Sequence, residues 1–269
     1  MALSAFLGVL VGAILGLTGA GGGILAVPAL AVGMHWTMQQ AAPVALIAVA
    51  MGAAVGALEG LRHGLVRYKA AALIAVSGFP LVYIGQSLAH QLSQAVLQAG
   101  FSGVMLLVAF RLARQVRLNS ATGADLQFAM ARINPDSGKF VWSVSTAALL
   151  ACIGGATGFL TGLLGVGGGF VIVPMLRKFT EVSMQGVVAT SLMVIALVGA
   201  SGVGSAIIHQ TSIPWGSAAV FSATTVFGML LGRRLIKKIS ANHVQVGFAA
   251  VLTLVALGLL ASALLALLG

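Results

Sequence analysis

Two glycine-rich blocks contain the residues with the clearest chemical potential. The stretches 16-GLTGAGGGILAVPAL-30 and 162-GLLGVGGGFVIVPML-176 both contain G-x-G-G-G and, after four further residues, a proline. Glycine has no Cβ atom, so a small anion can approach the backbone N–H groups closely. Helical arms that start near Ile24 and near Phe170 would direct unpaired N–H groups and a positive dipole end at that anion. Pro28 and Pro174 would lie in the first turns of these arms, where a missing N–H costs little.

Hydroxyl side chains near the blocks can add donors to the predicted anion site. Thr190 and Ser191, in 189-ATSL-192, align with Pro43 and Val44 of the first half, so the site is expected to be asymmetric. Each hydroxyl has an alternative role, a hydrogen bond to the backbone of its own helix. The predicted substrate-binding residues are Thr18, Gly19, Gly21, Gly22, Gly23, Thr161, Gly165, Gly167, Gly168, Gly169, Thr190 and Ser191.

Glycine also has a purely structural use, because small residues let membrane helices pack closely. This is the expected role of the scattered glycines Gly8, Gly12, Gly52 and Gly56. The five histidines are spread along the chain without metal-ligand spacing. They are expected near the ends of spans, and His209 is the one to test. We find no nucleophile–base pair, phosphate loop or metal cluster, so no catalytic residue, metal or cofactor is expected.

The composition sets the class of protein that these elements belong to. Apolar residues make up 59% of the 269 residues and charged residues 7%, which is typical of a polytopic helical membrane protein. The apolar runs are continuous rather than alternating, which argues against a transmembrane barrel. The net charge of +10 is explained by basic loops on one side of the membrane rather than by nucleic-acid binding. The first 16 residues lack the positive region of a signal peptide and are expected to belong to the fold.

The chain consists of two related halves. Gly16–Leu30 matches Gly162–Leu176 at an offset of 146 residues, and after a one-residue gap near Gln40 the offset is 147. The first repeat is predicted at 1–115 and the second at 142–269, joined by a polar linker at 116–141 that cannot cross a bilayer.

Each half contains three spans and one interrupted segment. The predicted spans are 39–58, 71–89 and 94–111 in the first half and 185–208, 214–232 and 243–268 in the second, all near the ~20 residues that a membrane helix needs. The interrupted segments are 3–32 and 142–176. At ~1.5 Å per residue, each arm of such a segment is expected to reach only about mid-membrane.

The basic residues discriminate between two topologies. If the interrupted segments cross the membrane, the 14 Lys and Arg divide eight against six between the two sides. If both segments are re-entrant, all 14 fall on one side, which the positive-inside rule makes cytoplasmic. Three crossings per half then give the halves opposite orientations. We therefore predict an all-α membrane protein of two inverted repeats, each with one broken re-entrant hairpin and three transmembrane helices, and with both termini outside.

Inverted repeats with discontinuous helices are a recurring plan of secondary transporters. No Lys, Arg, Asp or Glu lies in the central part of any span, whereas a cation transporter is expected to have an intramembrane acid. Glu59 and Glu181 lie at span ends. The leading hypothesis is a secondary transporter of an anion, with alternating access around the glycine blocks. A passive anion channel of the same architecture is the alternative, and a membrane-embedded enzyme or scaffold is a third class.

The sequence resembles the sulfite exporter TauE/SafE family, also called the toluene-sulfonate uptake permease family. The resemblance rests on the two glycine blocks with Pro28 and Pro174, on 189-ATSL-192 and on 231-LGRRLIKKIS-240. Pro43-Val44 departs from the family pattern, in which many members have a hydroxyl pair. Membership implies about eight hydrophobic segments and transport of small anions, chiefly sulfur oxyanions and organosulfonates. The expected partners are a small anionic substrate, the lipid bilayer of the cell (cytoplasmic or inner) membrane and, as an option, a second copy in a homodimer, but no nucleic acid.

Overall fold

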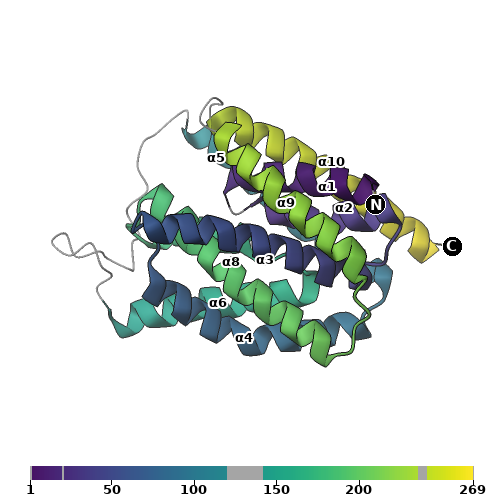
Figure 1. Cartoon of the computed structure of the whole chain (residues 1–269), viewed down its shortest axis with the longest axis horizontal. Coiled ribbons are helices and arrows are strands. Elements are labelled where there is room, and N and C mark those ends of the chain that lie inside the picture. The colour runs from purple at the N-terminus through teal and green to yellow at the C-terminus, as the bar shows by residue number, and fades with distance from the viewer. Residues whose placement is uncertain (1, 20, 120–141, 236–240, 269) are drawn as a thin grey trace.

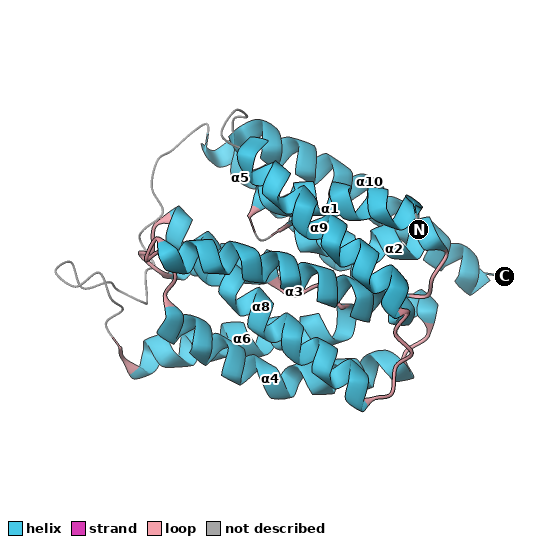
Figure 2. Ribbon diagram, in the orientation of Figure 1, coloured by secondary structure: helices cyan, strands magenta, loops and turns pink. Residues whose placement is uncertain are grey.

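The computed structural model describes residues 2–19, 21–119, 142–235 and 241–268, and the polar linker lies outside this range (Figure 1). Helices and short loops make up the described chain, which contains no strand (Figure 2). The elements are α1 (Ala2–Thr18), a 3₁₀ turn η1 (Gly22–Leu25), α2 (Ala26–Met34), α3 (Met38–Arg62), α4 (Tyr68–Gln91), α5 (Gln94–Asn119), α6 (Val144–Leu164), α7 (Gly169–Phe179), α8 (Met184–Ile208), α9 (Trp215–Leu235) and α10 (Ala241–Leu268).

The six predicted spans are confirmed as the helices α3, α4, α5, α8, α9 and α10. Two of them begin at equivalent hydroxyl caps, because Thr37 accepts from the backbone N–H of Gln40 and Ser183 accepts from that of Gly186. Such caps satisfy an N–H that has no partner inside the helix. Helix α5 is longer than predicted: it continues to Asn119, past the expected limit of the first repeat at 115.

The arms of the interrupted segments are unequal, and the prediction of two half-length arms is wrong for the first arm of each. Helix α1 has 17 residues and α6 has 21, against 9 in α2 and 11 in α7. At ~1.5 Å per residue, α1 is about 26 Å long and α6 about 31 Å. Seven described helices are long and apolar enough to cross a membrane. Six of them are the predicted spans, and the seventh is α6. The sequence placed each break correctly, but composition gave no information on how far the first arm extends.

Helix α2 returns along α1. A methyl group added to Gly22 would overlap the backbone N of Leu15, and one added to Gly33 would overlie the side chain of Leu7. Residues later in the segment formed by η1 and α2 thus contact residues earlier in α1, which is the pattern of an antiparallel hairpin. In the second half, Gly168, which precedes α7, lies against Thr157 of α6.

Equivalent helices of the two halves make equivalent main contacts. Helices α3 and α8 pack against each other, and so do α5 and α10. Helix α1 packs on α9 as α6 packs on α4, and α9 packs on α3 as α4 packs on α8. The most extensive helix contacts of the first half therefore have counterparts in the second.

The close helix pairs use the scattered glycines. A methyl group on Gly12 would overlap the carbonyl oxygen of Thr225 in α9, and one on Gly8 would overlap Thr224 Oγ1. Gly52 and Gly56 of α3 face the side chain of Met229. The packing role predicted for these four glycines is confirmed.

The two ends of the helix bundle differ in charge. The chain ends marked N and C lie at the same end (Figure 1). At that end the loops 35–37, 92–93 and 209–214 contain no Lys or Arg, and we call it the neutral end. The opposite end, where α3, α5, α7 and α9 finish, holds Arg62, Arg114, Lys178 and Arg234, and we call it the basic end. Large apolar side chains such as Phe6, Val76, Phe110 and Leu254 are exposed between the ends, as expected of a multi-pass membrane protein.

Candidate functional site

The side chain of Thr18 makes hydrogen bonds to the backbone on both sides of the first glycine break. Gly19 follows α1 with a φ of +83°, and η1 begins three residues later at Gly22. The Thr18 hydroxyl donates to the Ile14 carbonyl at 2.8 Å and accepts from the Gly22 N–H at 2.8 Å. Thr18 therefore has the backbone-bonding role that was its alternative interpretation, and it also stabilises the break.

The second break has no comparable side-chain hydrogen bond at the start of its second helix. Gly165, Gly167 and Gly168 have φ values of +72°, +76° and +68°, a region that favours glycine. Helix α7 starts at Gly169, close to the predicted start at Phe170, and no side chain caps it. The Val171 N–H donates to the Gly168 carbonyl at 3.0 Å, whereas the N–H groups of the two preceding buried residues, Gly169 and Phe170, have no intrahelical acceptor. They are available to a bound anion.

A buried hydroxyl lies beside these amides without a partner. The Thr161 side chain is 0% exposed, and its Oγ1 makes no hydrogen bond. A methyl group on Gly168 would lie 3.0 Å from this oxygen. Because a buried polar atom without a partner costs free energy, Thr161 Oγ1 has hydrogen-bonding capacity that a ligand or a water molecule can satisfy.

The two breaks touch each other. A methyl group on Gly23 would lie 3.3 Å from the carbonyl oxygen of Val166, and Gly23 and Gly167 both face Val49. Gly167 also faces Ile195. Val49 and Ile195 each lie eleven residues after the start of a 25-residue helix, α3 or α8. The breaks therefore meet halfway along the two central helices.

Of the two adjacent hydroxyl residues in α8, Thr190 has a hydrogen-bond partner and Ser191 has none. Thr190 Oγ1 accepts from the backbone N–H of Arg67 at 3.0 Å and so anchors the loop before α4. Ser191 is 0% exposed, and its Oγ has no partner. Ser191 lies one turn before Ile195 on the same face of α8, and Ile195 faces Gly167 of the second break.

Charge is absent from the middle of the described helices. Glu59 lies three residues before the end of α3 and forms an ion pair with Arg233 of α9, while Glu181 lies between α7 and α8. The donors around the breaks are amides and hydroxyls, and the helix starts add positive dipole ends. This environment favours a negative ligand.

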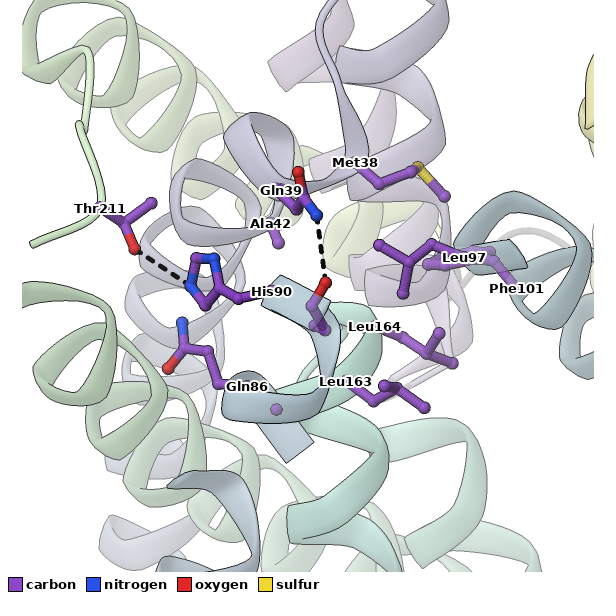
Figure 3. A pocket seen from close by; sticks show the side chains of 12 residues that line it. Met38, Gln39, Ala42, Gln86, His90, Leu97, Phe101, Leu163, Leu164 and Thr211 are labelled. Carbon is purple, nitrogen blue, oxygen red and sulfur yellow. Dashed lines mark hydrogen bonds between the residues drawn. The ribbon is translucent and has the colours of Figure 1, made fainter. Parts of the chain in front are cut away.

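A pocket approaches the breaks from each end. At the neutral end, a pocket of about 20 Å³ is lined by Met38, Gln39, Gln86, His90 and Leu164, among others (Figure 3). That volume is close to the smallest that holds one water molecule. At the basic end, a pocket of about 260 Å³ is lined by Glu59, Gly60, His63, Leu65, Met184, Gln185, Val188, Ala189 and Arg233. The pocket at the basic end is thus the larger of these two.

The comparisons with known proteins agree with this architecture. Residues 4–259 match the model of the protein family described as sulfite exporter TauE/SafE. The chain belongs to this family. It is 24% identical to the probable membrane transporter protein YunE of Bacillus subtilis over 93% of both chains. It is 27% identical to a probable membrane transporter protein of Xylella fastidiosa, with 87% of this chain and 84% of the relative aligned. No solved structure matches the chain.

The family assignment confirms the resemblance drawn from the glycine blocks, and this TauE/SafE protein is a multi-pass membrane transporter. The fold brings together five of the twelve predicted site residues: Gly22, Gly23, Gly167, Gly168 and Gly169 lie at or next to the meeting point of the breaks. Gly19 lies against Val188 and Gly165 against Ala42, where they end the first arms. Gly21 lies under the ring of Phe248.

One detail of this TauE/SafE site was predicted wrongly. Pro28 is the third residue of α2, as expected, but Pro174 is the sixth residue of α7 and lies in its second turn. A proline there leaves the carbonyl oxygen four residues earlier, that of Phe170, without its usual helical donor.

Sequence reasoning missed the pockets at the two ends of the TauE/SafE bundle. The place of Gln86 and Arg233 in these pockets depends on the packing of α4 against α6 and of α9 against α1. The 147-residue offset between the two residues was a usable sequence signal, because it identifies them as equivalent positions of the two halves. Sequence reasoning also missed an aromatic cluster at the neutral end. The ring of His209 stacks on Tyr83 at 4.8 Å and lies 5.5 Å from His90.

Proposed function

We propose that this protein is a secondary transporter of a small sulfur-containing anion, such as sulfite or an organosulfonate. The anion binds where the two glycine breaks meet, with the uncapped start of α7, Thr161 and Ser191 as donors. The observation that carries the proposal is the contact between Gly23 and the Val166 carbonyl at the middle of α3 and α8, beside two buried hydroxyls that have no partner. Thr18 and Thr190 shape this site through the backbone bonds that they make.

The proposed architecture is an inverted repeat with two re-entrant hairpins. The exchangeable helix contacts, the return of α2 along α1 and the common end of both termini support it. The basic end is cytoplasmic in this proposal, because Lys and Arg concentrate on the cytoplasmic side of membrane proteins. Both termini are then outside, in the cell (cytoplasmic) membrane.

The proposed mechanism is alternating access to this central site. The pocket of about 260 Å³ at the basic end and that of about 20 Å³ at the neutral end fit a state open to the cytoplasm. Relative motion of the two halves would exchange which pocket is open, as in other transporters built from inverted repeats.

A flux experiment distinguishes this transporter from a passive anion channel. In proteoliposomes, we expect labelled sulfite to accumulate above its outside concentration when a membrane voltage or proton gradient is imposed. Large passive currents in planar bilayers, without accumulation, would instead support the channel. Chemical conversion of the anion by purified protein would support the enzyme class.

The topology makes a separate prediction. In a Cys152→Ala background, His35→Cys is expected to react with a membrane-impermeant maleimide only from outside the cell, and Lys178→Cys only from inside. Both side chains are exposed, so the difference reports the side of the membrane rather than burial. Labelling of both positions from the same side would contradict the re-entrant hairpins.

A further inference from the structure

The two end pockets are formed by equivalent positions of the two halves. Met38 and Gln39 line the pocket at the neutral end, and Met184 and Gln185, 146 residues later, line the pocket at the basic end. An anion that moves between the ends would therefore pass two related vestibules.

One equivalent pair differs in charge. Gln86 lines the neutral-end pocket, and Arg233, 147 residues later, lines the basic-end pocket. Gln86 is 7% exposed and its Oε1 has no partner, whereas Arg233 forms an ion pair with Glu59, which lines the same pocket. A guanidinium group therefore stands in one vestibule where a neutral amide stands in the other.

The two partners of the ion pair are held unequally. Arg233 packs between α1 and α3: a methyl group on Gly16 would lie 3.0 Å from its backbone N, and one on Gly56 would lie 3.4 Å from its Nη2. Its side chain is 25% exposed, against 56% for that of Glu59. The Glu59 carboxylate can therefore return to water at small cost, since exposed ion pairs contribute little.

We propose that Arg233 binds the transported anion in the basic-end vestibule and that Glu59 is the carboxylate which the anion displaces. This inference rests on the proposed function. A guanidinium group offers an oxyanion two parallel N–H donors, as it does a carboxylate, so the anion and Glu59 compete for the same donors. His63 and Gln185 complete the polar lining, and His63 is the other titratable group of the pocket.

A purely structural ion pair predicts different mutant behaviour. If the pair only joins the ends of α3 and α9, neutralising either partner has the same effect on transport. If Arg233 captures the anion and Glu59 competes with it, the two neutral variants have opposite effects on apparent affinity.

The experiment is sided uptake of labelled sulfite in proteoliposomes, with the half-saturating concentration measured for sulfite presented at the basic end. We compare wild type with Arg233→Gln, Arg233→Lys and Glu59→Gln. Arg234→Gln is the matched control, because Arg234 is exposed and does not line the pocket. Thermal unfolding of each purified variant reports whether it folds.

Arg233→Gln is expected to raise the half-saturating concentration at the basic end by about tenfold, and Glu59→Gln to lower it several-fold. Arg233→Lys should lie between wild type and Arg233→Gln, and Arg234→Gln should match wild type. If wild type transports sulfite and Arg233→Gln and Glu59→Gln both raise the half-saturating concentration to the same extent, this inference is overturned and the proposed function stands. Absence of transport of sulfite, thiosulfate, sulfoacetate and sulfate by wild type would overturn both.

Discussion

Gly168→Leu is expected to abolish anion binding. A side chain at this position would overlap Thr157 and approach Thr161 Oγ1, and a φ of +68° disfavours any residue other than glycine. Holding a non-glycine residue in this conformation costs about 1–2 kcal/mol before any steric overlap is counted. The new side chain would also cover the uncapped N–H groups at the start of α7.

Titration calorimetry with sulfite measures the binding loss, and thermal unfolding shows whether the variant folds. Gly100→Leu is the matched control, because a side chain at Gly100 meets nothing within 4 Å. Gly168→Ala adds the smallest side chain and is expected to reduce binding less than leucine does. Equal affinity in Gly168→Leu and Gly100→Leu would show that the anion binds elsewhere.

Removal of the two unpartnered hydroxyls is expected to weaken anion binding while leaving the protein at least as stable. In Thr161→Val with Ser191→Ala, two buried oxygen atoms that make no hydrogen bond are lost. Leaving a buried polar group unsatisfied costs about 1–3 kcal/mol, so the unliganded protein should unfold at the same temperature or higher. A hydrogen bond to a charged ligand is worth about 1.5–3 kcal/mol, so affinity should fall by at least about tenfold for each hydroxyl.

These opposite signs distinguish ligand donors from structural hydroxyls. Thr225→Val is the control: Thr225 is equally buried, but its hydroxyl donates to the Phe221 carbonyl of its own helix at 2.7 Å. That variant should lose no affinity. A double variant that binds sulfite as well as wild type does would remove Thr161 and Ser191 from the site.

The sequence was most informative where a pattern occurs twice. The doubled glycine blocks predicted the positions of both breaks, and the structure shows the two breaks in contact at Gly23. The continuous apolar runs predicted six spans, and their boundaries mostly agree to within a few residues. In the structure, the hydroxyl caps Thr37 and Ser183 precede the starts of two of these helices.

The sequence was least informative where the outcome depends on packing between distant segments. The lengths of α1 and α6 follow from their glycine-mediated contacts with α9 and α4, which composition does not reveal. The same holds for the hydroxyls. Thr190 is bound by Arg67, 123 residues away, whereas its neighbour Ser191 is left unpaired. Only the fold separates these two adjacent residues.

The most direct test of the central claim is uptake of sulfite, thiosulfate, sulfoacetate and sulfate into proteoliposomes containing wild type, Gly22→Leu or Gly168→Leu. Each leucine lies in a different glycine break: at Gly22 it would overlap the backbone of Leu15, and at Gly168 the side chain of Thr157. We expect wild type to transport at least one of the sulfur-containing anions and both variants, folded by thermal unfolding, to transport none. Normal transport by both variants would contradict the claim that the anion binds where the two breaks meet.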